Sequence, residues 1–298
     1  MSRAFLHQAS VPAASALHYG ALHREWLDGR LDEFTPWSDS ELSWTGLQRF
    51  AEFAIAYDVL VGSPLFDPGV ATRWRSFIAT HVGDPAYGEW ARGSLQTAWA
   101  ILLPYLILRR HGFVDPYHDA TLSLSRRAGF PTILEVVPYR ALDYAYFGTR
   151  AGLLDMDQRE VQRLLDSTFA GRAHCRFLVD AEAAYGLTHA IFYATEFGQS
   201  SLSEDRLPAV NRIIDSMIID SCIHRRFDLL AELLICSVVV SGTKPFIREI
   251  GMEVLYESLD ASGSLLPDGS TAARSFPAAY HTTLVGLILC ASLARPMH

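Results

Sequence analysis

Apolar residues recur at spacings of three and four along almost the whole chain, which is the pattern of amphipathic and buried helices. Proline and glycine interrupt this pattern at short intervals. It predicts twelve helices, at residues 10–29, 38–62, 68–82, 91–111, 117–128, 132–151, 157–170, 181–197, 203–219, 222–240, 245–260 and 278–293. Stretches of strict alternation are scarce, so we expect an all-α protein with very little strand.

Several of these expected helices begin with a recognisable start signal. Ser38-Asp39-Ser40-Glu41 has the spacing of a capping box, in which two side chains satisfy the free N–H groups of the first turn. Pro68, Pro116 and Pro131 lie where a first helical turn tolerates proline. These signals support the starts of four of the helices.

The expected helices also alternate in character along the chain. The even-numbered ones are rich in aromatic residues, Leu, Ala and Val, whereas the third, fifth, seventh and ninth carry charged residues on one face. This alternation favours an α/α toroid of about six helical hairpins around a central cavity. An irregular bundle or an α-solenoid is the alternative. In a toroid, polar residues near the starts of the inner helices would face the same end of the cavity.

Composition limits the classes of protein. Half of the 298 residues are hydrophobic and 19% are charged, which is typical of a compact body, and we expect one domain over residues 1–298. The net charge is −8 without an extended basic cluster, which argues against a nucleic-acid partner. The longest apolar run, 229–240, is too short to span a bilayer, and no signal peptide is visible. Four scattered cysteines suit reduced thiols, so we expect a cytoplasmic protein without a membrane partner.

The first candidate segment carries charged residues in an otherwise apolar helix. Glu135, Arg140 and Asp143 lie here, and Tyr139 stands beside them. Arg140 and Asp143 can pair at a spacing of three. The pattern leaves two interpretations open: a buried clamp between helices, or a site for an anionic substrate.

The second segment contains a histidine on an apolar stripe. Tyr185, His189, Phe192 and Glu196 fall on this stripe, and Tyr193 lies one turn beyond the histidine. A lone histidine in such a place is often only a satisfied core residue. With tyrosines one turn away on both sides, His189 is also a candidate general base.

The third segment enters a very apolar helix with its polar residues on one face. His224, Asp228 and Glu232 follow one another at intervals of four, and Cys222 and His224 are candidate metal ligands. Two carboxylates one turn apart would repel, so one pKa should rise and the two could act as an acid–base or cation-binding pair. The alternative is salt bridges to Arg225, Arg226 or Arg140.

The fourth segment, Tyr280-His281-Thr282-Thr283, opens the last expected inner helix. If the helices form a toroid, His281 faces the same end of the cavity as His189 and Cys222. We therefore expect it to take part in chemistry, the alternative being a histidine that caps or packs at a helix start.

Two short segments resemble a known family. Asp220-Ser221-Cys222, which we place at a helix start, and Tyr280-His281-Thr282 are similar to the zinc-binding elements of protein prenyltransferase β subunits, which are terpenoid-cyclase-like α/α toroids. The resemblance implies that Asp220, Cys222 and His281 hold zinc, with a fourth position open for chemistry and His224 as a reserve ligand. The Gly-Gly-Phe repeats of that family are missing here.

The chain also resembles uncharacterised helical proteins of actinobacteria that are encoded beside natural-product pathways. The similarity lies in Thr188-His189-Ala190, Asp228-Leu229-Leu230-Ala231-Glu232 and Tyr280-His281-Thr282-Thr283. Lys244 is the only lysine, and this preference for arginine suits a genome of high GC content. The resemblance implies an accessory enzyme of specialised metabolism.

These observations together predict an enzyme that acts on a small or carrier-bound intermediate in an apolar cavity by cyclisation, dehydration or isomerisation. His189 and His281 would form the acid–base pair, and Asp228 or Glu232 would orient a histidine. The hydrogen-bond donors would be Tyr139, Tyr185 and Tyr280, and Arg140 would bind an anion. This chemistry needs no cofactor, although zinc remains open. The alternatives are a non-catalytic scaffold for a peptide or partner enzyme and a zinc-dependent transferase, and a homodimer is left open.

Overall fold

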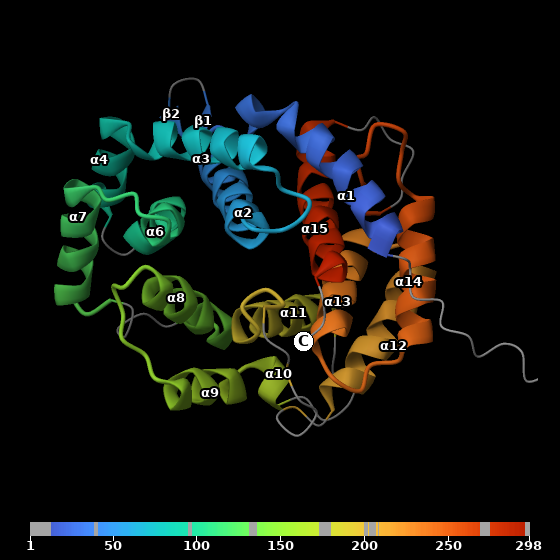
Figure 1. Cartoon of the computed structure of the whole chain (residues 1–298). Coiled ribbons are helices and arrows are strands. Elements are labelled where there is room, and N and C mark those ends of the chain that lie inside the picture. Colours follow the sequence, from blue (N-terminus) through green and yellow to red (C-terminus); the bar gives the residue numbers. More distant parts are fainter. Residues whose placement is uncertain are drawn as a thin grey trace, which may run out of the picture.

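The protein is an all-α molecule, as the hydrophobic periodicity predicts (Figure 1). The computed structural model describes residues 13–38, 41–94, 97–130, 136–172, 180–199, 202, 207, 209–268 and 275–295. Within them, the strands form a single two-residue hairpin, in which β1 (Trp37–Ser38) pairs antiparallel with β2 (Glu41–Leu42).

The helices begin and end as follows: α1 Ala13–Asp28, the 3-10 helix η1 Leu31–Phe34, α2 Trp44–Leu60, α3 Pro68–Val82, α4 Pro85–Gly93, α5 Ala98–Ile101, α6 Leu103–Arg110, α7 Pro116–Arg127, α8 Pro138–Arg150, α9 Gln158–Ser167, α10 Phe169–Arg172, α11 Ala181–Ala194, α12 Val210–Ile223, α13 Phe227–Val239, α14 Pro245–Glu257 and α15 Phe276–Ala294.

Local start signals explain where several of these helices begin. Asp67 accepts hydrogen bonds from two backbone N–H groups of α3, and Asp115 does the same for α7, each just before a proline in the first turn. The starts predicted at Pro68 and Pro116 agree with these caps. Pro131 lies outside the described residues.

The predicted capping box at residues 38–41 is wrong. Ser38 belongs to β1 and Glu41 to β2, and α2 is instead capped by Ser43, whose Oγ accepts a hydrogen bond from the backbone N–H of Gly46 at 3.0 Å. A short hairpin therefore replaces the first turn of the helix expected at 38–62.

The helix predicted at 91–111 is also wrong, because three helices share this segment and its flank. Asp84 caps α4, which therefore starts before residue 91 and ends at Gly93. Two short helices follow, α5 and α6, and Pro104 lies in the first turn of α6. Glycine ends a helix readily, and proline is tolerated only in the first turn. The helix expected at 157–170 is likewise split, because Thr168 is extended between α9 and α10.

Six helices contact one another in a closed cycle: α2, α6, α8, α11, α13, α15 and again α2. Six further helices pack on the outside of this cycle: α1 on α15, α3 on α2 and α6, α9 on α8, α10 on α11, and α12 and α14 on α13 (Figure 1). This arrangement provides the inner and outer layers that the alternation of character predicts. Assignment to the α/α toroid fold class stays a prediction.

Arginine side chains join the C-terminal ends of the inner helices through ion pairs and hydrogen bonds. Arg110 at the end of α6 bonds Asp58 of α2 at 2.6 Å, and Arg150 at the end of α8 pairs with Glu196 just beyond α11. Arg295, directly after α15, donates to the carbonyl oxygen of Val59 at 2.7 Å. Arg295 also donates to the carbonyl oxygen of Phe197, just beyond α11, at 3.2 Å. The inner helices therefore run in one direction, so that residues near their starts gather at one end.

Helix α15 is the one described helix that is long and apolar enough to cross a bilayer, but 78% of its apolar window is buried inside the molecule. It lies between α1, α2 and α13 (Figure 1). This burial is typical of a core helix. A cytoplasmic location stays a prediction.

Candidate functional site

The inner helices enclose a cavity of about 490 Å³, within the range of small-molecule sites. Most of its wall is aromatic or aliphatic. The aromatic lining residues are Trp44, Trp99, Tyr144, Phe147, Phe192, Tyr193 and Phe197, and the polar ones are Gln48, Glu52, Arg140, Asp143, His189, Glu232 and His281. The cavity therefore combines an apolar body with a small set of ionisable groups.

The cavity opens at the end where the inner helices start. Trp44 in the first turn of α2 is 58% exposed, and the side chain of Arg140 in the first turn of α8 is 49% exposed. At the other end, Ile55 and Leu106 line the cavity one turn before the Asp58–Arg110 ion pair. The site is thus a cavity that is open at one end, with polar residues near the opening and apolar residues at the closed end.

His281 lies between carboxylates from two other helices. Its Nδ1 is 2.8 Å from Glu52 of α2, and its Nε2 is 3.3 Å from Asp228 and 3.8 Å from Glu232 of α13. Burial on its own would lower the pKa of His281, but the hydrogen bonds and negative charges of the surrounding carboxylates raise it well above its ordinary value. This imidazole is therefore held as an imidazolium at neutral pH.

His189 approaches the same cluster from α11. Its Nε2 is 3.7 Å from Oε1 of Glu232, the oxygen that His281 also faces. Its Nδ1 is buried without a hydrogen-bond partner among the described residues, and the ring of Tyr139 contacts the imidazole edge to face, with centroids 5.4 Å apart. Glu232 accepts a hydrogen bond from Thr188 and is fixed between the two histidines.

The two carboxylates of α13 have shifted pKa values in opposite directions. Burial raises the pKa of Asp228, although His281 opposes this, while the nearby Glu232 adds to the rise. Burial would also raise the pKa of Glu232, but His189 and His281 lower it to about 2. The expectation that one of the two pKa values rises is confirmed. Within the described residues these carboxylates pair with histidines and not with the arginines that the alternative required.

The three tyrosines predicted as hydrogen-bond donors contact the cluster, but none of them is among the described residues that line the cavity. Tyr185 donates to Oδ2 of Asp228 at 2.7 Å, and burial together with that carboxylate raises its pKa well above the ordinary value. Burial and the nearby Glu52 likewise raise the pKa of Tyr280 above its ordinary value. These two hydroxyls therefore stay neutral, and Tyr139 lies against His189.

Arg140 and Asp143 form the predicted pair, with Nη1 of the arginine 3.1 Å from Oδ2 of the aspartate. Burial raises the pKa of Asp143 and Arg140 opposes the rise. The guanidinium also lies over the ring of Tyr139, 5.4 Å from its centroid. Both members line the cavity, and a substrate anion would have to compete with Asp143. Glu135 lies outside the described residues.

The zinc ligands implied by the resemblance are not brought together. Asp220 and Cys222 lie in the last turn of α12, so the expected helix start is wrong. Asp220 pairs with Arg226 at 3.1 Å and with the exposed His224 at 3.4 Å, and burial raises the pKa of Cys222. Among the described residues no group of three or more His, Cys, Asp or Glu is arranged to hold a metal. Zinc binding stays a prediction.

Two further expectations about shared helix faces are wrong. His224 precedes α13, so it does not continue the face of Asp228 and Glu232. Helix α11 ends at Ala194, and Glu196 and Phe197 then adopt positive φ angles of 53° and 52°. This left-handed backbone takes Glu196 off the stripe of His189 and brings it to Arg150.

Glu52, which makes the closest contact to His281, is not among the residues predicted for the site. Glu52 is an acidic residue in an apolar helix, and Gln48 donates to it from one turn earlier at 2.8 Å. A carboxylate among Phe50, Phe53 and Ala54 was the signal that could have revealed it, since buried acids are rare unless they are paired.

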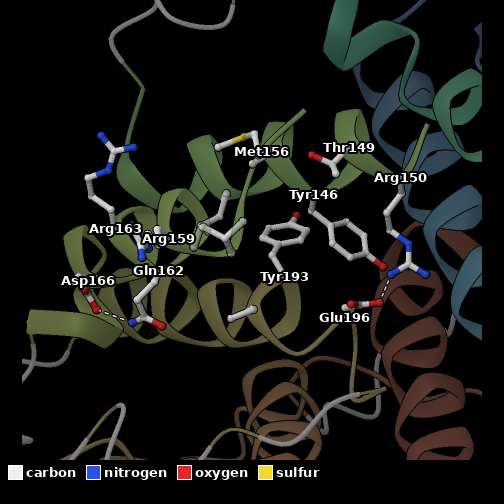
Figure 2. Close-up of a pocket in the computed structure, with 14 residues that line it drawn as sticks. Tyr146, Thr149, Arg150, Met156, Arg159, Gln162, Arg163, Asp166, Tyr193 and Glu196 are labelled. Atoms are coloured by element: carbon white, nitrogen blue, oxygen red, sulfur yellow. Dashed lines mark hydrogen bonds and ion pairs between the residues drawn. The ribbon is translucent and has the colours of Figure 1, made fainter. Parts of the chain in front are cut away.

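A second hollow, of about 790 Å³, lies outside this cavity between α8, α9 and α11 (Figure 2). Arg150 and Glu196 pair at one end of it, and Gln162 donates to Asp166 at the other (Figure 2). Tyr193 lines both hollows and forms part of their common wall. No histidine is among the described residues that line the second hollow, whereas His189 and His281 line the first.

The fold and the site define an all-α protein whose helices surround a cavity lined by histidines and carboxylates. The chain belongs to the family described as "Domain of unknown function (DUF6895)", which matches residues 20–291. No curated protein and no solved structure matches the chain.

Proposed function

We propose that the protein is an accessory enzyme of bacterial specialised metabolism that performs acid–base chemistry on a small or carrier-bound intermediate in the central cavity. One observation carries the proposal: His189 and His281, from different helices, face the same oxygen of Glu232 on the wall of a mostly apolar cavity. Ionisable pairs with shifted pKa values in a cavity are typical of catalytic sites.

His281 is the proposed proton donor. Both of its ring nitrogens face carboxylates, so the imidazolium is the favoured form, and the ring also lines the cavity. Glu52 and Asp228 hold the orientation of the ring. A substrate atom that gains electron density beside His281 would receive its proton.

His189 is the proposed proton acceptor. The distance of 3.7 Å between its Nε2 and Glu232 is longer than a hydrogen bond, so a substrate atom can bond to this nitrogen in the cavity. Glu232 would stabilise the imidazolium that forms. The enzyme would thus remove a proton from one atom of the substrate and donate a proton to another. Isomerisation, dehydration and acid-initiated cyclisation need these two transfers.

The mouth of the cavity supports a carrier-bound substrate or, as the alternative function, a scaffold that binds a partner. Trp44 and Trp90 are 58% and 37% exposed and contact each other edge to face, with centroids 5.4 Å apart. Exposed tryptophan pairs are typical of binding surfaces. The scaffold alternative does not require the histidines, so the experiment below separates it from the enzyme.

Deuterium exchange tests the proposal without knowledge of the substrate. The purified protein is incubated in D₂O with a small-molecule extract of the source organism, and mass spectrometry detects compounds that gain deuterium or change mass. We expect such compounds with the wild type and their loss with His189→Ala and with His281→Ala. His224→Ala is the matched control, because this histidine is exposed directly after the end of α12. Unchanged exchange in both cavity variants would refute the acid–base assignment.

A further inference from the structure

We propose that the substrate of the central cavity carries a positive charge, as an amine, and that its ammonium group binds beside Glu52 and Glu232. The inference rests on the proposed function and names the class of its substrate. It follows from the balance of charges around the cavity, the aromatic wall, and unpartnered polar atoms in the same wall.

The charges around the cavity do not balance. Glu52, Asp228 and Glu232 all face His281, at 2.8, 3.3 and 3.8 Å. Of these three carboxylates, Glu232 is the one with which His189 forms an ion pair in the described part of the chain. Even with both imidazoles protonated, three carboxylates meet two cations. Within the described residues no arginine or lysine forms an ion pair with these three carboxylates.

The other charged pair in the cavity does not correct this imbalance. Arg140 is already bound to Asp143 at 3.1 Å, so the two together add no net charge. The anion-binding role predicted for Arg140 would require this pair to open. A positively charged ligand, in contrast, would meet carboxylates that lack a full complement of cations.

Burial makes the uncompensated charge costly. The side chain of Glu232 is 2% exposed, and those of Asp228 and Glu52 are 17% and 20% exposed. A carboxylate withdrawn from water is stable only when it is paired or when it takes up a proton. A ligand cation would supply the missing partner and would bind more tightly for that reason.

The rest of the wall suits an organic cation more than a hydrated metal ion. Seven aromatic residues line the cavity, including Trp44, Trp99 and Tyr193. Aromatic faces attract ammonium groups and also pack against the apolar body of an amine. The volume of about 490 Å³ corresponds to about 16 waters at roughly 30 Å³ each, which is ample for an amine with one ring and a short chain.

The wall also contains polar atoms that lack a partner. Trp99 is 1% exposed and lines the cavity, and its indole N–H has no hydrogen-bond partner among the described residues. Nδ1 of His189 is likewise unpartnered in that part of the chain. Buried donors are nearly always satisfied in a functional state. A substrate with a carbonyl or hydroxyl oxygen in addition to its amine could satisfy the indole.

A matched series of probes tests the charge. The ligands are 4-phenylbutylamine, 4-phenylbutan-1-ol and 4-phenylbutyrate, which differ only in the terminal group, and binding at pH 7.5 is measured by ligand-observed NMR and calorimetry. We expect the amine to bind about tenfold more tightly than the alcohol, which is about 1.4 kcal/mol. The carboxylate should bind most weakly.

Two variants place the effect in the cavity. Glu52→Gln should weaken binding of the amine by about fivefold to tenfold and leave binding of the alcohol unchanged, since only the charged interaction is lost. Glu257→Gln on the exposed face of α14 removes the same charge outside the cavity. It should change neither the affinity for the amine nor the affinity for the alcohol. Melting curves of both variants confirm that they are folded.

Four results would overturn the proposal: equal affinity for amine and alcohol, tighter binding of the carboxylate, no binding of any probe at millimolar concentration, or an amine affinity that Glu52→Gln leaves unchanged. Failure of the proposed function has a different signature. Selective amine binding together with deuterium exchange that persists in the histidine variants would keep the cation site and refute the acid–base chemistry.

Discussion

Acid should destabilise the protein through one buried histidine outside the cavity. His23 of α1 is fully buried, and its Nδ1 is 2.7 Å from the carbonyl oxygen of Gly263. Its Nε2 has no partner among the described residues and lies beside Gly286 of α15, 3.0 Å from where a Cβ atom would stand. Burial lowers the pKa of His23 from 6.5 to about 4, although the bond to Gly263 opposes the shift. The folded protein therefore holds this ring neutral.

The direction of the effect follows from the two pKa values. The unfolded chain takes up a proton on His23 near pH 6.5, whereas the folded chain does so only near pH 4. The contribution of neutral His23 to the free energy of unfolding is therefore fully present above pH 6.5. It is lost as the pH falls, and the loss is complete below pH 4. At pH 4.5 the loss amounts to roughly 2–3 kcal/mol, since each pH unit between the two pKa values is worth about 1.4 kcal/mol.

The variant His23→Asn isolates this effect. The amide nitrogen of asparagine can donate to the carbonyl of Gly263 as Nδ1 does, but the side chain does not titrate. Free energies of unfolding are measured in urea at pH 7.5 and pH 4.5 for both proteins. Groups that titrate in both proteins cancel in the difference. The advantage of the wild type over His23→Asn should shrink by roughly 2–3 kcal/mol at the lower pH. An advantage that stays constant between the two pH values would refute the reasoning.

Three further predictions concern other parts of the molecule. The carboxylates raise the pKa of His281, so its contribution to stability is fully present below pH 6.5 and is lost as the pH rises through the pKa of the folded state. The advantage of the wild type over His281→Gln in urea unfolding should therefore decline towards alkaline pH. An increase of this advantage would contradict the reasoning. Gly263→Ala should lower the free energy of unfolding by more than about 2 kcal/mol in the same assay, since φ is +90° and a Cβ would lie 2.4 Å from a backbone oxygen. The control Gly62→Ala, with φ of +83° and open space around it, should lower it by about 1 kcal/mol. Equal costs would contradict the steric argument. The resemblance to prenyltransferases predicts about one zinc per chain by elemental analysis of the untreated protein, with loss of the metal in Cys222→Ala, and protein purified without stoichiometric zinc would contradict it.

Local patterns in the sequence determined much of the helical framework. The helix predicted at 68–82 coincides with α3, because the Asp67 cap and Pro68 act within one turn. The same holds for the pair of Arg140 and Asp143, whose spacing on a helix places them together whatever surrounds them. Prediction failed where two local signals competed, as at residues 38–43, where a short hairpin takes the place of a first helical turn.

By itself, the sequence determined that the protein is all-α, that Asp228 and Glu232 share a helix face, and that His189 and His281 are unusual on apolar helices. Only the tertiary structure decided which helices bring their side chains together. Glu52 meets His281 although 229 positions separate them in the chain, and Asp220 and Cys222 lie at the end of a helix, where Asp220 pairs with its own neighbours. The physical reason is that periodicity and capping act over one or two turns. Contacts between helices depend instead on how whole apolar faces pack, and no short motif encodes that.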